Sequence, residues 1–457
     1  MIKDRIIMQT QDPLIRNHNF NEVALGFSEN EAILEASRCL QCKNPTCIAA
    51  CPASVKIPDF IRLIKEKNSR VAYDTIYKDN VLPAVCGRVC PQESQCEGAC
   101  VLNRTGRPIA IGALERYVGD ESLKCGECKD EKIIPNGKKV AVVGSGPAGL
   151  ANAASLRRMG YDVDIYEALH EFGGVLQYGI PAFRLPKTIV ESEVLRLEKL
   201  GIKFHKNVII GKSLTIDQMK NELGYDAIFV GTGAGLPKSL GVPGEGHSGV
   251  FSANEFLIRV NLMKATPAMD YPTPIRIGDN VAVIGGGNVA MDAARVAKRL
   301  GAKNVFILYR RDKSSLPARL EEVIHAEEEG IIFKLLHNPV EFIGENHQLK
   351  AVRCEKMELG ELDSSGRAKP VGTGQYETFP VDSAIVSIGE NPNPIISKAT
   401  PGLETDRKGQ IVVNNHQTSI AGVFAGGDVV IGAATVILAI GEGKDAAIAI
   451  DEYLKKI

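Results

Sequence analysis

Eight cysteines stand in two short runs in the first quarter of the chain, and thiols this close together are suited to binding metal. The first run, CLQCKNPTCIAACP, begins at Cys39, and the second, CGRVCPQESQCEGAC, begins at Cys86. The first run keeps the last gap and the proline of the ferredoxin pattern C-x2-C-x2-C-x3-C-P, in which the fourth cysteine serves the other of two clusters. Cys39, Cys42 and Cys47 could therefore hold one [4Fe-4S] cluster while Cys51 reaches toward another.

Zinc is the competing interpretation of the same thiols. The second run contributes Cys86, Cys90, Cys96 and Cys100. The gaps in both runs differ from the paired C-x2-C pattern of structural zinc sites, and eight thiols suit two clusters. Ten of the eleven cysteines lie between positions 39 and 128 of a chain without an export signal, which favours ligation over disulfides. We therefore prefer iron and sulfur.

The remaining cysteines need no functional role. Cys125 and Cys128 form a C-x-x-C pair, KCGECKD, among charged residues in what resembles a linker between domains. Such a pair could be a redox dithiol, but we interpret it as a bystander. Cys354 stands alone.

A glycine-rich turn at 143–150 predicts a dinucleotide site. In VVGSGPAGL, Gly144, Gly146 and Gly149 have the G-x-G-x-x-G spacing between an apolar run and a helical pattern. These glycines permit a tight turn, close approach of a pyrophosphate and close helix packing. The next apolar run ends at Glu167, where a carboxylate accepts hydrogen bonds from ribose hydroxyls. The alternative is a purely structural strand-turn-helix unit.

A second fingerprint, VIGGGNVAMD, places Gly285 and Gly287 in the G-x-G-x-x-A pattern. Its following strand has Tyr309 where the first has an acid, and then Arg310 and Arg311. Guanidinium groups can hold a 2′-phosphate that a carboxylate would repel, so we expect NADP(H) rather than NAD(H). The alternative is that YRRD is a solvated strand end.

Two dinucleotide sites in one chain suggest a flavoprotein in which nicotinamide and flavin meet between domains. In VFAGGDVVIGAATVILAIG, Gly427 and Asp428 precede a helical pattern, and the aspartate could accept a hydrogen bond from a ribityl hydroxyl of FAD or serve only as a helix cap. Because the cofactors carry hydride chemistry, we expect no catalytic triad and no catalytic side chain.

The bulk composition fits a globular protein of two or three domains. The 457 residues contain 54 Lys and Arg against 55 Asp and Glu, so no strong field attracts nucleic acid or an anionic membrane. The start of the chain does not have the pattern of a secretory signal, and the longest apolar run, 429–441, is too short to span a bilayer. We expect a cytoplasmic protein.

These patterns predict an α/β fold in three parts. Residues 1–135 should form a helical iron-sulfur module, and two doubly wound dinucleotide-binding domains should follow it. We expect the FAD-binding domain at 136–275 and 391–457 and the NADPH-binding domain at 276–390. The stretch MKATPAMDYPTPIRIGD is rich in proline and fits a crossing between domains.

The order of motifs resembles a known family. From Asn21 to Leu454 the chain resembles the small subunit of NADPH-dependent glutamate synthase. The motifs that carry this resemblance are, in order, the cysteine module, GSGPAGL, GGVLQYGIPAFRLPK, GTGAG, AVIGGGNVAMD, YRR and VFAGGDV. The related large subunit of the electron-bifurcating NADH-dependent ferredoxin:NADP oxidoreductase is similar too. The resemblance implies FAD, NADP(H), two [4Fe-4S] clusters and an NADPH domain inserted into a split FAD domain. It also implies that Gly174 contacts FAD and Asn288 contacts NADPH.

The resemblance further implies crossed ligation of the two clusters. One cluster would take Cys39, Cys42, Cys47 and Cys100. The other would take Cys51, Cys90, Cys96 and, from the segment IGALERY, Glu115. Cys86 then ligates neither cluster, which departs from the eight thiols suggested by spacing. A carboxylate ligand should alter the potential of its cluster.

The family resemblance leaves two activities open. A glutamate synthase subunit would deliver NADPH electrons to a large partner that makes glutamate, and we expect that partner to carry the glutaminase and FMN sites. A bifurcating subunit would couple NADPH oxidation to reduction of ferredoxin and NAD through a smaller ferredoxin:NAD reductase-type flavin subunit. In either case the assembly would be a hetero-oligomer.

A disulfide reductase would need a dithiol near the nicotinamide, yet Cys354 is the only cysteine from Val281 to Gly389. A non-enzymatic scaffold is disfavoured because both fingerprints are intact.

Overall fold

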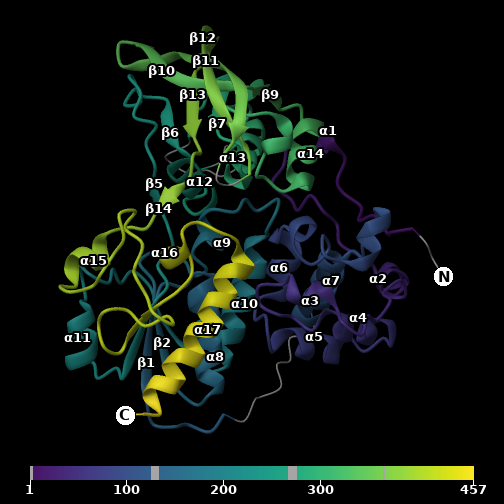
Figure 1. Cartoon of the computed structure of the whole chain (residues 1–457), viewed down its shortest axis with the longest axis vertical. Helices are drawn as coiled ribbons and strands as arrows, with labels where there is room; N and C mark the ends of the chain where they lie inside the picture. Colours follow the sequence, from purple (N-terminus) through teal and green to yellow (C-terminus); the bar gives the residue numbers. More distant parts are fainter. Residues whose placement is uncertain (1–3, 125–132, 266–274, 364–365, 457) are drawn as a thin grey trace.

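The computed structural model describes residues 4–124, 133–265, 275–363 and 366–456, which form a helical module and two α/β units (Figure 1). The Cys125 and Cys128 pair lies outside the described residues, as does most of the proline-rich crossing at 263–279. Among the residues described, no helix is long and apolar enough to cross a membrane.

The N-terminal module consists of short helices around the two cysteine runs. Its helices are α1 (Pro13–Arg16), α2 (Glu29–Ala36), α3 (Thr46–Ala49), α4 (Ile57–Lys65), α5 (Ser69–Tyr77), α6 (Pro83–Val89) and α7 (Ile111–Lys124), with 3-10 turns η1 (Gln92–Ser94) and η2 (Val101–Thr105). Helix α2 begins with a capping box, because Ser28 and Glu31 each bond the backbone N-H of the other. In α4, the apolar residues recur with helical spacing and are buried.

Two glycines allow helices α6 and α7 to touch through their backbones. A Cβ on Gly87 would lie 2.4 Å from the backbone N of Arg116, and a Cβ on Gly119 would lie 2.6 Å from that of Ala84. No larger side chain fits at either position without moving a helix. This contact brings the second cysteine run beside Glu115.

The first α/β unit has a parallel sheet in the order β15-β4-β1-β2-β3. The strands are β1 (Lys139–Val143), β2 (Asp162–Tyr166), β3 (Lys203–His205), β4 (Ala227–Val230) and β15 (Val423–Ala425). The helices are α8 (Pro147–Arg158), α9 (Val175–Tyr178), α10 (Lys187–Lys199), α11 (Ile216–Asn221), α15 (Ile395–Ala399), α16 (Asp428–Ile431) and α17 (Val436–Leu454). Strand β15 comes from the far end of the chain, so this unit is interrupted by the second one.

The second α/β unit has a parallel sheet in the order β6-β13-β7-β8-β9. Its strands are β6 (Val250–Ser252), β7 (Asn280–Ile284), β8 (Asn304–Tyr309), β9 (Ile332–Leu335) and β13 (Ser383–Val386), and its helical segments are α12 (Ala253–Asn261), α13 (Asn288–Arg299), η3 (Lys313–Ser315) and α14 (Leu320–Glu328). An antiparallel layer of β10 (His337–Glu345), β11 (Gln348–Leu362) and β12 (Ala368–Pro380) lies beyond it.

The inserted unit begins earlier than the expected boundary at residue 275. Strand β6 pairs with β13, and α12 packs in the second core, so residues 250–261 belong to the second unit. The chain passes between the two units twice, and β5 (Leu236–Pro237) of the first passage pairs antiparallel with β14 (Glu390–Asn391) of the second. A three-residue strand leaves too little periodicity to be recognised from sequence.

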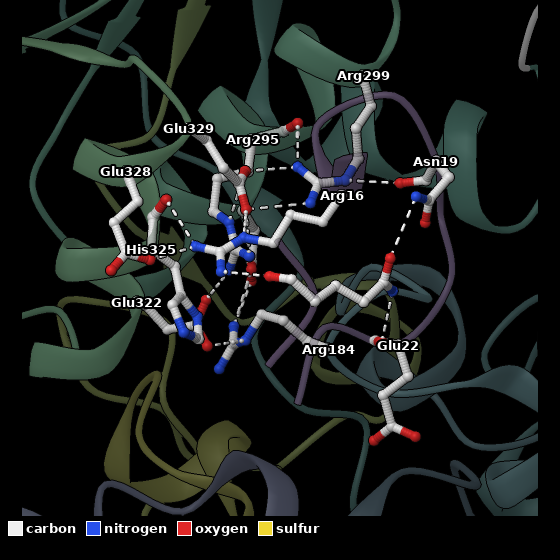
Figure 2. Close-up of polar contacts among 12 residues, drawn as sticks. Arg16, Asn19, Glu22, Arg184, Arg295, Arg299, Glu322, His325, Glu328 and Glu329 are labelled. Carbon is white, nitrogen blue, oxygen red and sulfur yellow. Dashed lines mark hydrogen bonds and ion pairs between the residues drawn. The ribbon is translucent and has the colours of Figure 1, made fainter. Parts of the chain in front are cut away.

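The N-terminal strap, residues 9–24, crosses from the module to the second unit, and α1 lies beside α14 (Figure 1). Figure 2 shows Arg16 of this strap among buried charges from α13 and α14. Its guanidinium bonds Glu329 at 2.9 Å and Glu328 at 2.6 Å, while Val23 donates its backbone N-H to Phe183 of the first unit at 2.9 Å. The strap therefore joins all three parts.

Candidate functional site

The first cysteine run and the end of the second line one cavity. Four cysteines line this first cavity: Cys39, Cys42, Cys47 and Cys100. Cys39 and Cys42 lie in the loop between α2 and α3, Cys47 lies in α3, and Cys100 directly precedes η2. Thr46 joins the two runs, because its hydroxyl donates to the carbonyl of Ala99 at 2.5 Å. The remaining wall includes Leu40, Ile61 and Ile109 and is largely apolar.

A second cavity shares part of its wall with the first. Its possible ligands are Cys51, Cys90, Cys96 and Glu115. Ile57 and Ile111 line both cavities, so the two candidate cluster sites are neighbours. The first cysteine run is divided between them, because Cys51 lines the second cavity while its three predecessors line the first. This division coincides with the crossed sets that the resemblance implied, whose role as ligands stays a prediction.

Asn80 hydrogen-bonds two buried groups beside the second cavity, Glu115 and Cys86. Its amide donates to the Glu115 carboxylate at 2.8 Å, and its carbonyl oxygen accepts from the Cys86 thiol at 3.7 Å. Glu115 lines the cavity, whereas Cys86 lines neither cavity as described. Burial raises the pKa of Glu115 to about 7, and the bond from Asn80 opposes this rise.

The donor sets fit iron-sulfur clusters. Burial raises the pKa of Cys47 and of Cys51 to about 11, so these thiols lose their protons readily only if a cation replaces them. Within the described ranges, no three His, Cys, Asp or Glu side chains converge closely enough to hold a single metal ion. The thiols instead line the two cavities, as ligands at the corners of an iron-sulfur cube must.

The first glycine fingerprint leaves room for a phosphate where α8 begins. Gly144 has φ +101°, and its Cβ would lie 2.6 Å from the carbonyl of Gly231. A Cβ on Gly149 would lie 1.9 Å from the carbonyl oxygen of Gly144. In contrast, apart from its chain neighbours no described residue comes within 4 Å of the Cβ position of Gly146, so a ligand can reach the helix N-terminus there. Gly174, with φ +55°, packs against Gly146.

Glu167 is bonded to the fingerprint loop. Its carboxylate accepts from the backbone N-H and the hydroxyl of Ser145 at 3.0 and 2.5 Å, and from the backbone N-H of Leu169 at 2.9 Å. The side chain thereby fixes the turn at the end of β2. Sequence reasoning missed this positioning role, and ribose binding by Glu167 stays a prediction.

Asp428 supplies a buried acceptor that needs a donor. Its Oδ1 is buried and has no hydrogen-bond partner among the described residues. Burial raises the pKa of this carboxyl to about 6, although a backbone N-H at Ala434 opposes the rise. Gly427 has φ +74°, and its Cβ would lie 2.8 Å from that of Ala148 on α8, which places α16 beside the fingerprint. An unpaired acceptor at this position fits a ribityl hydroxyl of FAD.

The second fingerprint repeats the same geometry. Gly285 has φ +138°, and its Cβ would lie 2.2 Å from the carbonyl of Ser387, while the Cβ position of Gly287 has no described atom within 4 Å. The side-chain oxygen of Asn288 accepts the backbone N-H of Arg319 at 2.8 Å. Asn288 therefore holds the segment before α14 next to the start of α13.

The two arginines after β8 have different surroundings. Arg310 is exposed. Arg311 is buried, donates to the carbonyl of Ala368 at 2.9 Å and pairs with Asp363 at 2.6 Å. This placement differs from the expected pair of phosphate ligands, because the antiparallel layer already engages Arg311. Arg367, which lies just before β12 and which sequence reasoning missed, lines an open cavity with Ser314 and Ser315.

Two family models match the chain, one over the N-terminal module and one over the two α/β units. The family model for dihydropyrimidine dehydrogenase domain II, 4Fe-4S cluster, matches residues 16–127, and the model for pyridine nucleotide-disulphide oxidoreductase matches 138–446. The glutamate synthase [NADPH] small chain of Halomonas elongata is 38% identical over 449 residues, covering 96% of this chain and 94% of that one. The protein of the same name from Escherichia coli is 37% identical, covering 96% and 95%.

Other similarities are partial. The NADP(+)-dependent formate dehydrogenase subunit beta of Moorella thermoacetica is 38% identical, covering 90% of this chain but 60% of that protein. Among solved structures, Mycobacterium tuberculosis FprA in complex with NADPH has a TM-score of 0.58 at 22% identity, covering 70% of this chain and 85% of that one. At this identity the likeness concerns the fold, and it agrees with the two α/β units.

Proposed function

The chain belongs to the glutamate synthase [NADPH] small-chain family, and we propose that it transfers electrons between NADPH and a partner subunit of glutamate synthase. It is an NADPH-dependent oxidoreductase with FAD and iron-sulfur clusters. When bound, FAD exchanges hydride with the nicotinamide and single electrons with the clusters. The side chains of this protein hold and separate those groups.

The two cavities support this proposal most directly. The second cavity adjoins the first α/β unit, because Ile437 of α17 lines it. A Cβ on Gly441 of α17 would lie 2.9 Å from the carbonyl of Pro52, so helix and cysteine run are in backbone contact. The cavity with Glu115 is thus the one nearer to the FAD-binding fingerprint unit.

The first cavity lies toward the outside of the module. Two of its lining residues, Leu40 and Val101, have exposed fractions of 49% and 38%. Large apolar side chains exposed beside a redox site are suited to protein contact. We therefore assign this face to the partner subunit, with the shared wall of Ile57 and Ile111 between the two candidate cluster sites.

Anaerobic purification from native extract tests the identity of the partner. The proposal predicts that a large glutamate synthase chain purifies with this protein and that NADPH then supports glutamate formation from 2-oxoglutarate and glutamine. Recovery of a small ferredoxin reductase-type flavin subunit would instead support the bifurcating activity. A formate dehydrogenase chain would likewise contradict the proposed partner, since one relative bears that name.

A further inference from the structure

A group of polar side chains converges where the two α/β units are joined. Glu390 lies on β14, which pairs with β5, and these two-residue strands connect the sheets. Asn254 of α12, in the second unit, donates a hydrogen bond to the Glu390 carboxylate. Asp428 of α16 and Tyr178 of α9, both in the first unit, lie close enough to interact electrostatically with Glu390. Glu390 is thus placed between the halves that would present flavin and nicotinamide.

Asn254 has a buried oxygen that no described residue pairs with, which indicates that the junction binds a further molecule. Its amide also donates to the carbonyl of Gly235 at 2.8 Å. Its side-chain oxygen is buried, with 8% of the residue exposed, and has no partner in the described part of the chain. Together with Oδ1 of Asp428, two buried acceptors therefore await donors at one junction. Such atoms are costly unless a bound molecule pairs with them.

We propose that Glu390 exchanges the flavin proton with solvent during electron transfer to the clusters. This inference rests on the proposed function. Hydride from NADPH brings two electrons and one proton to the flavin, and one-electron carriers such as [4Fe-4S] clusters accept electrons without protons. One proton must therefore leave the flavin for every two electrons that reach the clusters. The Glu390 carboxylate accepts it and passes it to solvent, and the reverse transfer requires the reverse proton movement.

The surroundings of Glu390 suit a proton acceptor at neutral pH. Burial raises the pKa of Glu390 to about 7, the bond from Asn254 opposes this, and the charge of Asp428 adds to it. Burial and the nearby carboxylates raise the pKa of Tyr178 still further, so its phenol stays protonated. Lys238, which directly follows β5, places its Nζ 3.6 Å from the Cβ position of Gly389. Asp428 is assigned to the ribityl chain, which leaves Glu390 for the proton.

Rapid mixing of the holoenzyme separates the two half-reactions. Glu390→Gln should leave bleaching of the flavin by NADPH within about twofold of the wild-type rate, because hydride transfer needs no proton. It should slow reappearance of oxidised flavin, after mixing reduced protein with ferricyanide, by roughly 100-fold. The midpoint near pH 7 should disappear from the pH profile of that step, and Glu390→Asp should restore it. Glu404→Gln, an exposed carboxylate in the same unit, is the control.

The pH dependence of the flavin midpoint potential provides a readout that does not depend on turnover. The wild-type plot should bend near pH 7, and the Glu390→Gln plot should not. If Glu390→Gln loses FAD, Asn254→Ala decides instead. The hydrogen bond from Asn254 lowers the pKa of Glu390, so its loss should move the bend to higher pH. A bend that is unchanged in the variant that retains FAD overturns the inference. Wild-type protein that binds no FAD, or is not bleached by NADPH, would contradict the proposed function itself.

Discussion

Glu329 should be the most costly single charge to remove from the interdomain network. Its fully buried carboxylate accepts five hydrogen bonds, one from Arg16 at 2.9 Å and two each from Arg295 and Arg299 at 2.6–3.1 Å. Around it, four arginines face four carboxylates: Arg16, Arg184, Arg295 and Arg299 against Asp292, Glu322, Glu328 and Glu329. All of these except Asp292 are labelled in Figure 2. Glu329→Gln leaves this buried group with one uncompensated positive charge.

Breaking a buried ion pair on one side costs about 3–5 kcal/mol. For domains of 150–250 residues each kcal/mol lowers Tm by roughly 2–4 °C, so we expect the second unit to melt about 10 °C lower. Glu328→Gln is the matched control, because the adjacent carboxylate is 45% exposed and bonds only Arg16 among the described residues. Arg16 keeps its bond to Glu329 in this variant and only a half-exposed carboxylate is neutralised, so the control should shift Tm by a few degrees at most.

The difference between wild type and Glu329→Gln should depend on pH. Burial alone would raise the pKa of Glu329, but the bonds from Arg299 and Arg295 outweigh it and lower the pKa to about 2. A carboxyl with a lowered pKa stabilises the fold above its unfolded value near 4.5, and this stabilisation is lost as the pH falls toward 2. Thermal melts should therefore differ most at neutral pH and converge in acid. Equal shifts for Glu328→Gln and Glu329→Gln, or a pH-independent difference, would refute this account.

Five further substitutions test the cofactor sites. Glu115→Ala should alter the EPR signal of one reduced cluster, whereas Cys86→Ala should leave both signals intact, and the reverse pattern would contradict the ligand scheme. Asp428→Ala should weaken FAD binding by roughly 10–100-fold, measured as flavin lost on dilution, because one charged hydrogen bond contributes about 1.5–3 kcal/mol. Arg310→Ala should raise KM for NADPH about tenfold with little change for NADH. Arg311→Ala should chiefly lower thermal stability, because its guanidinium bonds Asp363 and Ala368.

Local features of the chain were predictable from sequence where spacing alone determines geometry. The turns at Gly144 and Gly285 have the predicted conformation, since each glycine packs against a carbonyl in the way the fingerprint requires. The split of the first cysteine run at Cys51 was also suggested by its C-x3-C-P ending. The general α/β class followed from alternating apolar runs and helical patterns.

Features that depend on distant partners could not be predicted from sequence. The partner of Arg311 is Asp363, which comes from a hairpin with no signal in the fingerprint region. Glu390 lies in a strand of two residues, too short for any periodicity, and its environment is set by Asn254 and Asp428 from other elements. The assignment of Glu115 as a ligand came only from the family resemblance. Asn80, which donates a hydrogen bond to Glu115, lies in no recognisable motif.

We expect one chain to join an NADPH-reducible flavin to two clusters in adjoining cavities. Anaerobic titration of the purified protein with NADPH, followed by visible and EPR spectroscopy, tests it most directly. The expected result is one FAD and the iron and sulfide of two [4Fe-4S] clusters per chain, bleaching of the flavin, and EPR signals from reduced clusters that interact magnetically through the shared wall. Zinc in place of iron, or a flavin that NADPH does not bleach, would contradict it.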